Sequence, residues 1–215
     1  MKTQQYITSW CVLKDNTVNI NGRLISNETS DQPGDLLKQL YRSHSMSYPK
    51  FFKMDALSRL AFVCSELLLD KRKLTHTYQP EDIGVILSNR SASLHTDMAY
   101  NESIIDRANY FPNPSLFVYT LPNIMIGEIC IRNGIKGENS FFVSSEPDFD
   151  FLTVHVNFLF DSGVINCCLS GWVEVSQQNH YEATLFLIEK NNLIEDTANF
   201  YTFAPQNVNK IHTLL

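Results

Sequence analysis

The five cysteines are the side chains best suited to nucleophilic or metal chemistry, but their spacing indicates neither disulfides nor zinc. Their number is odd and no CxxC pair occurs among them, as a disulfide framework or a zinc site would require. All but Cys11 lie in apolar runs, where a free cysteine acts as a small apolar side chain. We therefore expect no metal, no cofactor and a reducing compartment. The cysteines are Cys11, Cys64, Cys130, Cys167 and Cys168.

The basic triplet Lys71-Arg72-Lys73 is the second candidate for a site. The whole chain carries 17 basic and 23 acidic residues, a formal charge of −6, which argues against a general nucleic-acid binder. The triplet could still form a local basic patch, although a solvated helix end is the favoured interpretation.

Composition and the N-terminus place the protein in a broad class. With 215 residues, 44% hydrophobic and 19% charged, the chain can form one globular domain with a substantial core. The first ten residues contain no apolar segment, and no run of about 18 apolar residues occurs. We expect a cytoplasmic protein without a membrane span.

Hydrophobic periodicity predicts alternating strands and helices. Apolar residues at spacings of three and four predict a helix from Asp55 to Leu69, with Asp55 in its first turn. The unalternating run Ile83–Ser88 is typical of a strand covered on both faces. Further expected elements are the strands Gln5–Leu13, Thr17–Ile20, Ser140–Ser144, Val164–Val175 and Ala183–Glu189, and helices beginning near Asp35, at Asp97–Ala108, after Leu121 and at Phe151–Phe160.

This alternation indicates a layered α/β domain. We expect a mostly parallel, mixed five-stranded sheet with helices on both faces, in a single domain spanning residues 1–215. Residues 191–215 are less regular and are expected to form a tail.

Four segments, in order, resemble the N-terminal domain of β-ketoacyl synthases (3-oxoacyl-[acyl-carrier-protein] synthases), in the thiolase-like superfamily. They are Lys53–Leu69, Asp82–Asp97, Asn113–Glu146 and Phe160–Val175. The resemblance implies a thiolase-like half-fold and a place in fatty-acid or polyketide-type acyl-chain synthesis. Because the sequence ends at Leu215, at about half the family's length, we expect the family's second half to be absent.

The resemblance also implies a nucleophile turn, in which the family carries a reactive cysteine nine residues after a glycine. Counting from Gly137 leads to Glu146, whose carboxylate cannot form a thioester, and the neighbours Ser144 and Ser145 offer no cysteine either. Ser145 would need an adjacent base to act as a nucleophile, so a polar turn or cap is favoured for it. Glu146 could cap the helix that follows.

The histidines fit none of the family's catalytic histidine motifs, and each is better interpreted as an ordinary surface or core residue. We therefore expect no catalytic residue in this chain. The histidines are His44, His76, His95, His155, His180 and His212.

Three hypotheses follow from the resemblance. The first is a pseudoenzyme that forms a homodimer, or a heterodimer with a full-length ketosynthase, through the strand Ser140, Phe141, Phe142 and Val143; an internal strand is the alternative for this segment. The second is an acyl enzyme of altered chemistry, malonyl-decarboxylase-like or an acyltransferase, in which a buried Glu146 acts as acid or base. The third is a module that binds an acyl chain or acyl-carrier protein, against which the charge of −6 argues mildly.

Overall fold

The computed structural model describes residues 4–26, 33–176, 180–190 and 200–215. The strands are β1 (Gln5–Lys14), β2 (Thr17–Ile20), β3 (Arg23–Ser26), β4 (Ile83–Asn89), β5 (Asn139–Val143), β6 (Cys167–Val175), β7 (Tyr181–Lys190) and β8 (Tyr201–Thr202). The α-helices are α1 (Pro33–Ser43), α2 (Ala56–Leu69), α3 (Leu94–Glu102), α4 (Pro114–Phe117), α5 (Ile124–Asn133), α6 (Phe149–Asp161) and α7 (Pro205–His212). Short 3₁₀ turns are η1 (Pro49–Lys53), η2 (Leu74–His76), η3 (Pro80–Asp82), η4 (Arg107–Asn109) and η5 (Val118–Thr120).

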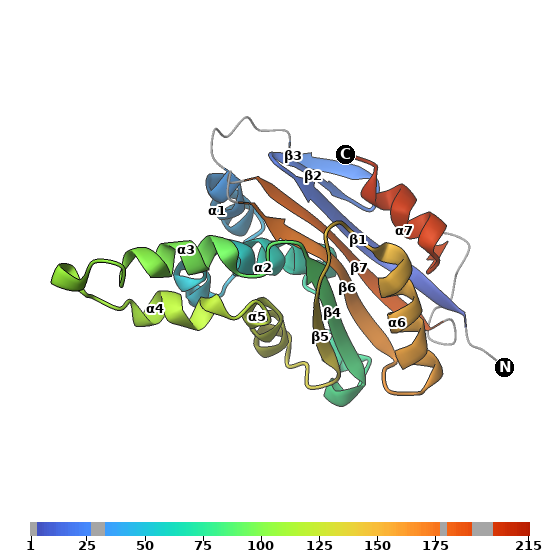
Figure 1. Ribbon diagram of the computed structural model, residues 1–215. Helices are drawn as coiled ribbons and strands as arrows, with labels where there is room; N and C mark the ends of the chain where they lie inside the picture. The colour runs from blue at the N-terminus through green and yellow to red at the C-terminus, as the bar shows by residue number, and fades with distance from the viewer. Residues whose placement is uncertain (1–3, 27–32, 177–179, 191–199) are drawn as a thin grey trace.

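A single mixed sheet runs through the molecule in the order β3-β2-β1-β7-β6-β4-β5, with β8 also pairing with β1 (Figure 1). The expected mixed sheet is confirmed, but among the described residues it has eight strands, not five. Only the pairs β4–β5 and β4–β6 are parallel, so the expectation of a mostly parallel sheet was wrong. The reason is local: β6 and β7, like β1 and β2, are joined by connections too short for a parallel crossover.

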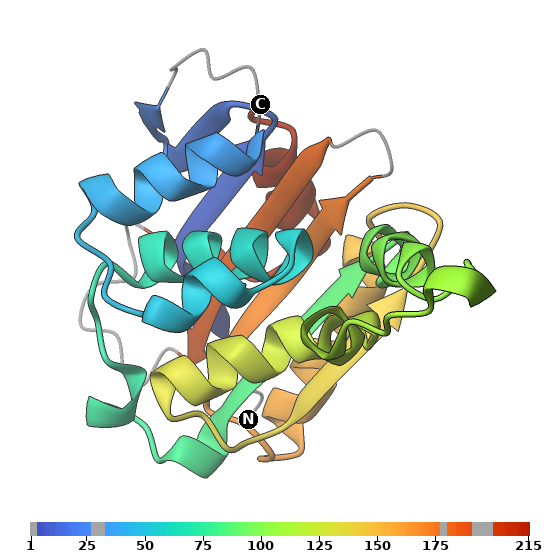
Figure 2. The same cartoon turned by 90° about the vertical axis from the view of Figure 1, so that its left-hand side faces the viewer.

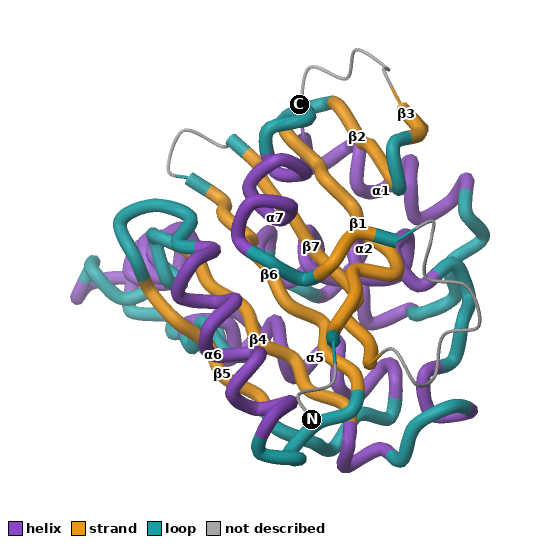
Figure 3. The backbone as a smooth tube through the Cα atoms, turned by 90° about the vertical axis from the view of Figure 1, so that its right-hand side faces the viewer, coloured by secondary structure: helices purple, strands orange, loops and turns teal. Residues whose placement is uncertain are grey.

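Helices cover both faces of the sheet, as expected. On one face α1, α2 and α5 pack over the larger hydrophobic cluster, which includes Leu60 and Val85 (Figure 2). On the other face α6 and α7 pack over a second cluster around Trp172 and Phe186 (Figure 3). The two clusters enclose β4, whose seven residues are all buried.

The helix α2 begins and ends through recognisable caps. Asp55 is its N-cap rather than a first-turn residue, and its carboxylate accepts a hydrogen bond from Ser58 N. At the other end Asp70 adopts a left-handed conformation, and its N–H donates to Glu66 O. These caps fix both ends of a helix whose central residues are buried in the core.

Two segments differ from the sequence-based expectation. The helix expected over Asp97–Ala108 is α3, which starts at Leu94 and ends at Glu102, followed by a bend and η4. Together α3, η4, α4 and η5 form an arm, residues 94–121, that projects from the body (Figure 1). In the expected irregular tail, residues 191–199 lie outside the described residues, but β8 and the regular helix α7 follow them.

Within the described ranges, no single helix has both the length and the apolar character needed to cross a membrane. The pair Pro114–Thr120 and Ile124–Asn133, bent by 97°, passes that test only when the two are taken together.

Candidate functional site: the turn between β5 and α6

The predicted nucleophile turn connects β5 to α6. Ser144 is half-buried, and its N–H donates to Asn89 O at 3.0 Å, which ties the turn to the end of β4. The Ser144 hydroxyl donates to Glu146 O at 2.7 Å and is therefore used within the turn. Ser145 and Glu146 are exposed. The three residues lie together, but their side chains do not converge on a buried pocket.

Glu146 does not cap α6, which corrects one expectation. The N-cap is Asp148, whose carboxylate accepts a hydrogen bond from Phe151 N at 2.9 Å. Two residues separate Glu146 from the first helical turn, since α6 starts at Phe149. Its carboxylate has no hydrogen-bond or ion-pair partner among the described residues.

No histidine of the described residues forms a hydrogen bond with Ser145 or Glu146. His155 lies further along α6, where its ring packs against Phe142 and Phe151. His212 lies on α7, 2.8 Å from the hydroxyl of Thr184. Among the described residues, neither Ser145 nor Glu146 therefore has a hydrogen-bonded histidine that could serve as its base.

The five cysteines are free, and four of them are buried. Burial raises the pKa of the half-buried Cys130 thiol to about 11, so little thiolate is present at neutral pH. Burial also raises the pKa of Cys168. None of the thiols stands at the turn. Over the described part of the chain, no three His, Cys, Asp or Glu side chains gather closely enough to hold a metal ion.

Gly137 lies where β5 approaches the end of η3. A Cβ atom there would overlap the carbonyl oxygens of Glu81 and Ile83. The glycine from which the turn was counted is thus required by a close backbone approach.

The strand β5 is an edge strand, so the alternative of an internal strand is not the one observed. It pairs with β4 on one side, from Asn139 opposite Val85 to Val143 opposite Asn89, and its other side is free among the described strands. Phe141 packs toward the larger cluster and Phe142 toward the other. Val143 is exposed.

Beside this edge, the outer face of α6 is apolar. Val154 is 69% exposed and Phe158 63% exposed, and Phe151 lies on the same face, one turn before Val154 and two turns before Phe158. The ring of Phe151 packs edge-on against Phe142, 4.8 Å between centroids. The apolar surface is therefore continuous from β5 to α6.

The arm carries a second apolar surface. Its most exposed aromatic side chain is Phe111, at 80%. Monomeric proteins rarely leave such groups of apolar side chains uncovered, and large exposed patches mark interaction sites. The other exposed apolar residues of the arm are Leu94, Met98, Ile105, Tyr110, Phe117, Val118 and Leu121.

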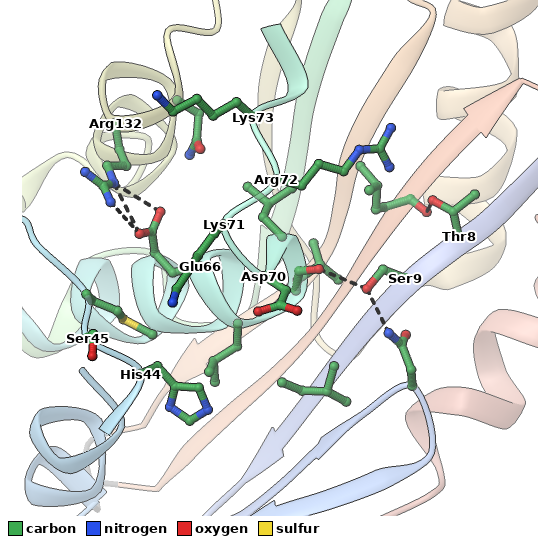
Figure 4. A pocket seen from close by; sticks show the side chains of 18 of the residues that line it. Thr8, Ser9, His44, Ser45, Glu66, Asp70, Lys71, Arg72, Lys73 and Arg132 are labelled. Atoms are coloured by element: carbon green, nitrogen blue, oxygen red, sulfur yellow. Dashed lines mark hydrogen bonds and ion pairs between the residues drawn. The ribbon is translucent and has the colours of Figure 1, made fainter. Parts of the chain in front are cut away.

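The triplet Lys71-Arg72-Lys73 follows the end of α2 and is exposed, as a solvated helix end would be. It also forms one wall of a large cleft, which the sequence did not reveal (Figure 4). The other walls come from segments far apart in the chain, so within the sequence only the basic triplet itself indicated a site here.

Comparisons with known proteins show which known fold this chain shares. Neither a protein-family model nor a curated protein matches the sequence. Among solved structures, the chain is similar to the ishigamide ketosynthase/chain length factor (16% identity, TM-score 0.63, covering 89% of this chain and 63% of that one). It is similar to a chain of the AntDE:AntF complex, a type II PKS acyl-carrier protein with its hexaketide-bound ketosynthase (12%, 0.60, 89% and 64%). It is also similar to a chain of ketosynthase ApeO in complex with its chain length factor ApeC from Xenorhabdus doucetiae (14%, 0.59, 98% and 91%).

The protein therefore has the thiolase-like fold of the β-ketoacyl synthases. It spans just under two thirds of the length of the first two chains it matches.

Proposed function

We propose that this protein is a non-catalytic ketosynthase-like subunit that pairs with a full-length ketosynthase, as an accessory partner in fatty-acid or polyketide-type acyl-chain synthesis. One observation carries the proposal: the free edge of β5 is flanked by exposed apolar side chains, beside a turn that has Glu146 where a thiol would be needed.

The edge of β5 can continue the sheet into a partner. An edge strand presents unpaired N–H and C=O groups that pair readily with a strand of another chain. Val143 and the outer side chains of α6, Val154 and Phe158, would then be covered by the partner. Covering them removes apolar surface from water at roughly 25 cal/mol per Å².

The arm widens the surface available to a partner. It extends away from the sheet on the side of β4 and β5 (Figure 1), with Ile105 and Phe111 exposed. Aromatic side chains of this kind dominate the binding energy of many interfaces. We therefore include the arm in the proposed interface.

An altered catalytic role has less support. An acid or base at Glu146 would profit from burial, which shifts a carboxyl pKa toward neutral values, but this side chain is exposed. Ser145 has no hydrogen-bonded histidine among the described residues. We therefore favour a partner that leaves the chemistry to another chain.

The structural neighbours support a heterodimer over a homodimer. Two of them are ketosynthases described with chain length factors, and the matched chain of the ApeO–ApeC complex is close in length to this protein, since 98% of one aligns with 91% of the other. A carrier protein occurs in a third, so a carrier is a further candidate partner. The five free cysteines are consistent with the cytoplasm as the compartment.

Co-expression with ketosynthases encoded near this gene, followed by size-exclusion chromatography with light scattering, tests the pairing. We expect a one-to-one complex that the double variant Val143→Lys/Val154→Lys weakens by about a hundredfold or more. The control Leu24→Lys places the same charge on an exposed apolar residue at the opposite edge of the sheet and should leave the complex intact. A self-associating protein that the β5 variant dissociates would indicate the homodimer instead, and a monomer that binds no ketosynthase would refute the proposal.

A separate assay tests whether the protein has no catalytic activity of its own. The isolated protein is incubated with malonyl-loaded carrier protein and decarboxylation is followed. We expect no product above background. Turnover that Glu146→Gln abolishes would instead establish the altered-chemistry enzyme.

A further inference from the structure

A large cleft lies away from the proposed interface, on the face of the sheet covered by α1, α2 and α5 (Figure 4). Its volume is about 1320 Å³. The C-terminal ends of these three helices meet there, at Ser43, Leu69 and Asn133, and the turn between β2 and β3 closes the opposite wall. No residue of β5 or α6 contributes to its lining.

The lining of the cleft is basic in an acidic protein. Five Arg or Lys side chains line it (Arg23, Lys71, Arg72, Lys73 and Arg132), against two acidic residues, Glu66 and Asp70. The formal charge of the lining is 5 − 2 = +3, while the whole chain carries −6. The rest of the molecule therefore carries −6 − 3 = −9, and the cleft is a local reversal of sign.

Two of these cations are already paired. Arg132 forms a forked pair with Glu66, with Nη2 at 2.8 Å from Oε2. Arg72 binds Glu189, which lies outside the lining. Figure 4 shows Arg72 pointing toward Thr8. Lys71 and Lys73 extend in the opposite direction, into the half of the cleft where Arg132 lies.

The remaining cations have no acidic partner within the described ranges. Lys71, Lys73 and Arg23 are exposed there and form no ion pair or side-chain hydrogen bond. Nor do the lysines form a hydrogen bond with the carbonyls at these helix ends, two of which accept from backbone N–H groups. The N–H of Asp70 donates to Glu66 O and that of Gly134 to Cys130 O.

The cleft fits a protein segment better than a small ligand. Small-molecule sites are about 300 to 1,000 Å³ and hold a few precisely placed polar groups. Here the volume is larger, and the free cations are on long exposed side chains. Apolar side chains such as Ile20, Met46 and Ile131 also line the cleft.

We propose that this cleft docks an acidic, partly apolar segment of another protein. Carboxylates of the segment pair with Lys71, Lys73 and Arg23, and its aliphatic side chains cover Ile20 and Ile131. Because the residues outside the lining carry a net negative charge, an acidic segment is attracted to the cleft over the rest of the molecule, and its association depends strongly on salt. The proposal is independent of ketosynthase pairing.

The probe is a fluorescent 16-residue peptide with Glu and Leu at helical spacing, and its counterpart with Gln in place of Glu. We expect the acidic peptide to bind and the neutral one to bind at least about tenfold more weakly. Lys71→Glu/Lys73→Glu should lower the affinity for the acidic peptide by about tenfold or more. Carbodiimide cross-linking, which joins amines to carboxylates without a spacer, should mark Lys71 and Lys73 in the wild-type protein.

A matched control separates the effect of charge within the cleft from the effect of the protein's net charge. Lys53→Glu/Lys210→Glu changes the net charge by the same amount at two exposed lysines outside the cleft and should leave the affinity within about twofold. Equal loss in both double variants, equal binding of the two peptides, no binding to the wild type, or cross-links only at other lysines would each overturn the proposal. The cross-linking readout needs no variant, so it decides the matter even if a variant misfolds.

Discussion

Arg72 and Glu189 form a two-pronged ion pair, with Nη1 at 2.9 Å from Oε2 and Nη2 at 2.7 Å from Oε1. Glu189 is only 3% exposed and also accepts hydrogen bonds from Tyr78 and Thr8. The pair joins the loop after α2 to β7, so it couples the wall of the basic cleft to the centre of the sheet.

We expect Arg72→Ala to lower the free energy of unfolding by about 2 kcal/mol. This is less than the roughly 3 to 5 kcal/mol for breaking a fully buried pair, because Arg72 is partly exposed and Glu189 keeps two other donors. Chemical denaturation measures the change. The neighbouring Lys73→Ala serves as control, because the Lys73 side chain has no partner among the described residues, and an equal loss in both variants would contradict this account.

The Glu189 carboxylate also makes the free energy of unfolding sensitive to acid. Burial alone would raise the pKa of Glu189, but hydrogen bonds from Arg72, Thr8 and Tyr78 outweigh it and hold the pKa below its usual value. Since the folded-state pKa is lower than that of the unfolded chain, this stabilisation is present above about pH 4.3 and is lost as pH falls below it. Unfolding free energies measured from pH 6 to pH 3 should fall less steeply in Glu189→Gln than in the wild type.

We expect His212 to make the stability of the protein depend on pH in a higher range than Glu189 does. Burial lowers its pKa, with Glu182 raising it and Lys14 lowering it, and its ring also faces Thr184 and Phe149. The unfolded chain therefore binds the proton more tightly, so stability falls as pH drops below about 6.5. Thermal unfolding between pH 8 and pH 5 should show a smaller loss for His212→Gln, and an unchanged slope would rule His212 out as its source.

The turn after β5 offers a direct comparison of two acidic residues. Asp148→Ala removes the N-cap of α6 and should cost about 1 kcal/mol, whereas Glu146→Ala, at an exposed carboxylate without a partner among the described residues, should stay within about 0.5 kcal/mol. Denaturant titration of both variants measures this. A larger cost at Glu146 would show that its carboxylate does more than the observed contacts suggest.

Replacing two glycines with alanine should change the stability of the protein in opposite directions. At Gly137 a Cβ would strike the backbone of Glu81 and Ile83, so Gly137→Ala should cost about 2 kcal/mol or more. At Gly127, inside α5, no atom beyond its chain neighbours and the nearby helix backbone lies within 4 Å of the added Cβ, so Gly127→Ala should stabilise by about 0.5 to 1 kcal/mol. Melting temperatures that move the same way in both variants would contradict this reading.

Local patterns were enough to predict the helix that became α2 and the buried strand β4. Their signals lie within a few residues: apolar spacing in Leu57–Leu68 and an unbroken apolar run in Ile83–Leu87. The end of α3 was missed because its signals are weak polar ones, such as the Ser103 hydroxyl bonding back to Tyr100 O. The helix α7 was missed because only Val208 and Ile211 of its eight residues are buried.

The order of strands and the basic cleft depend on contacts between distant segments. Nothing near β1 in the sequence indicates that it pairs with β7, and nothing near Lys71 indicates that Arg23 and Arg132 share its cleft. The turn at Glu146 was located through the resemblance, but its exposure, and the capping by Asp148, required the structure.

The pairing of β1 with β7 also constrains how the chain is made. Lys14 pairs with Glu182 and Gln5 with Lys190, so β1 cannot pair along this side until β7, which is synthesised much later, has left the ribosome. Only its local hairpin with β2 can form early. Since such long-range closures are slow and leave edges open to aggregation, yields should be limited during synthesis more than by the finished protein, and should improve when translation is slowed.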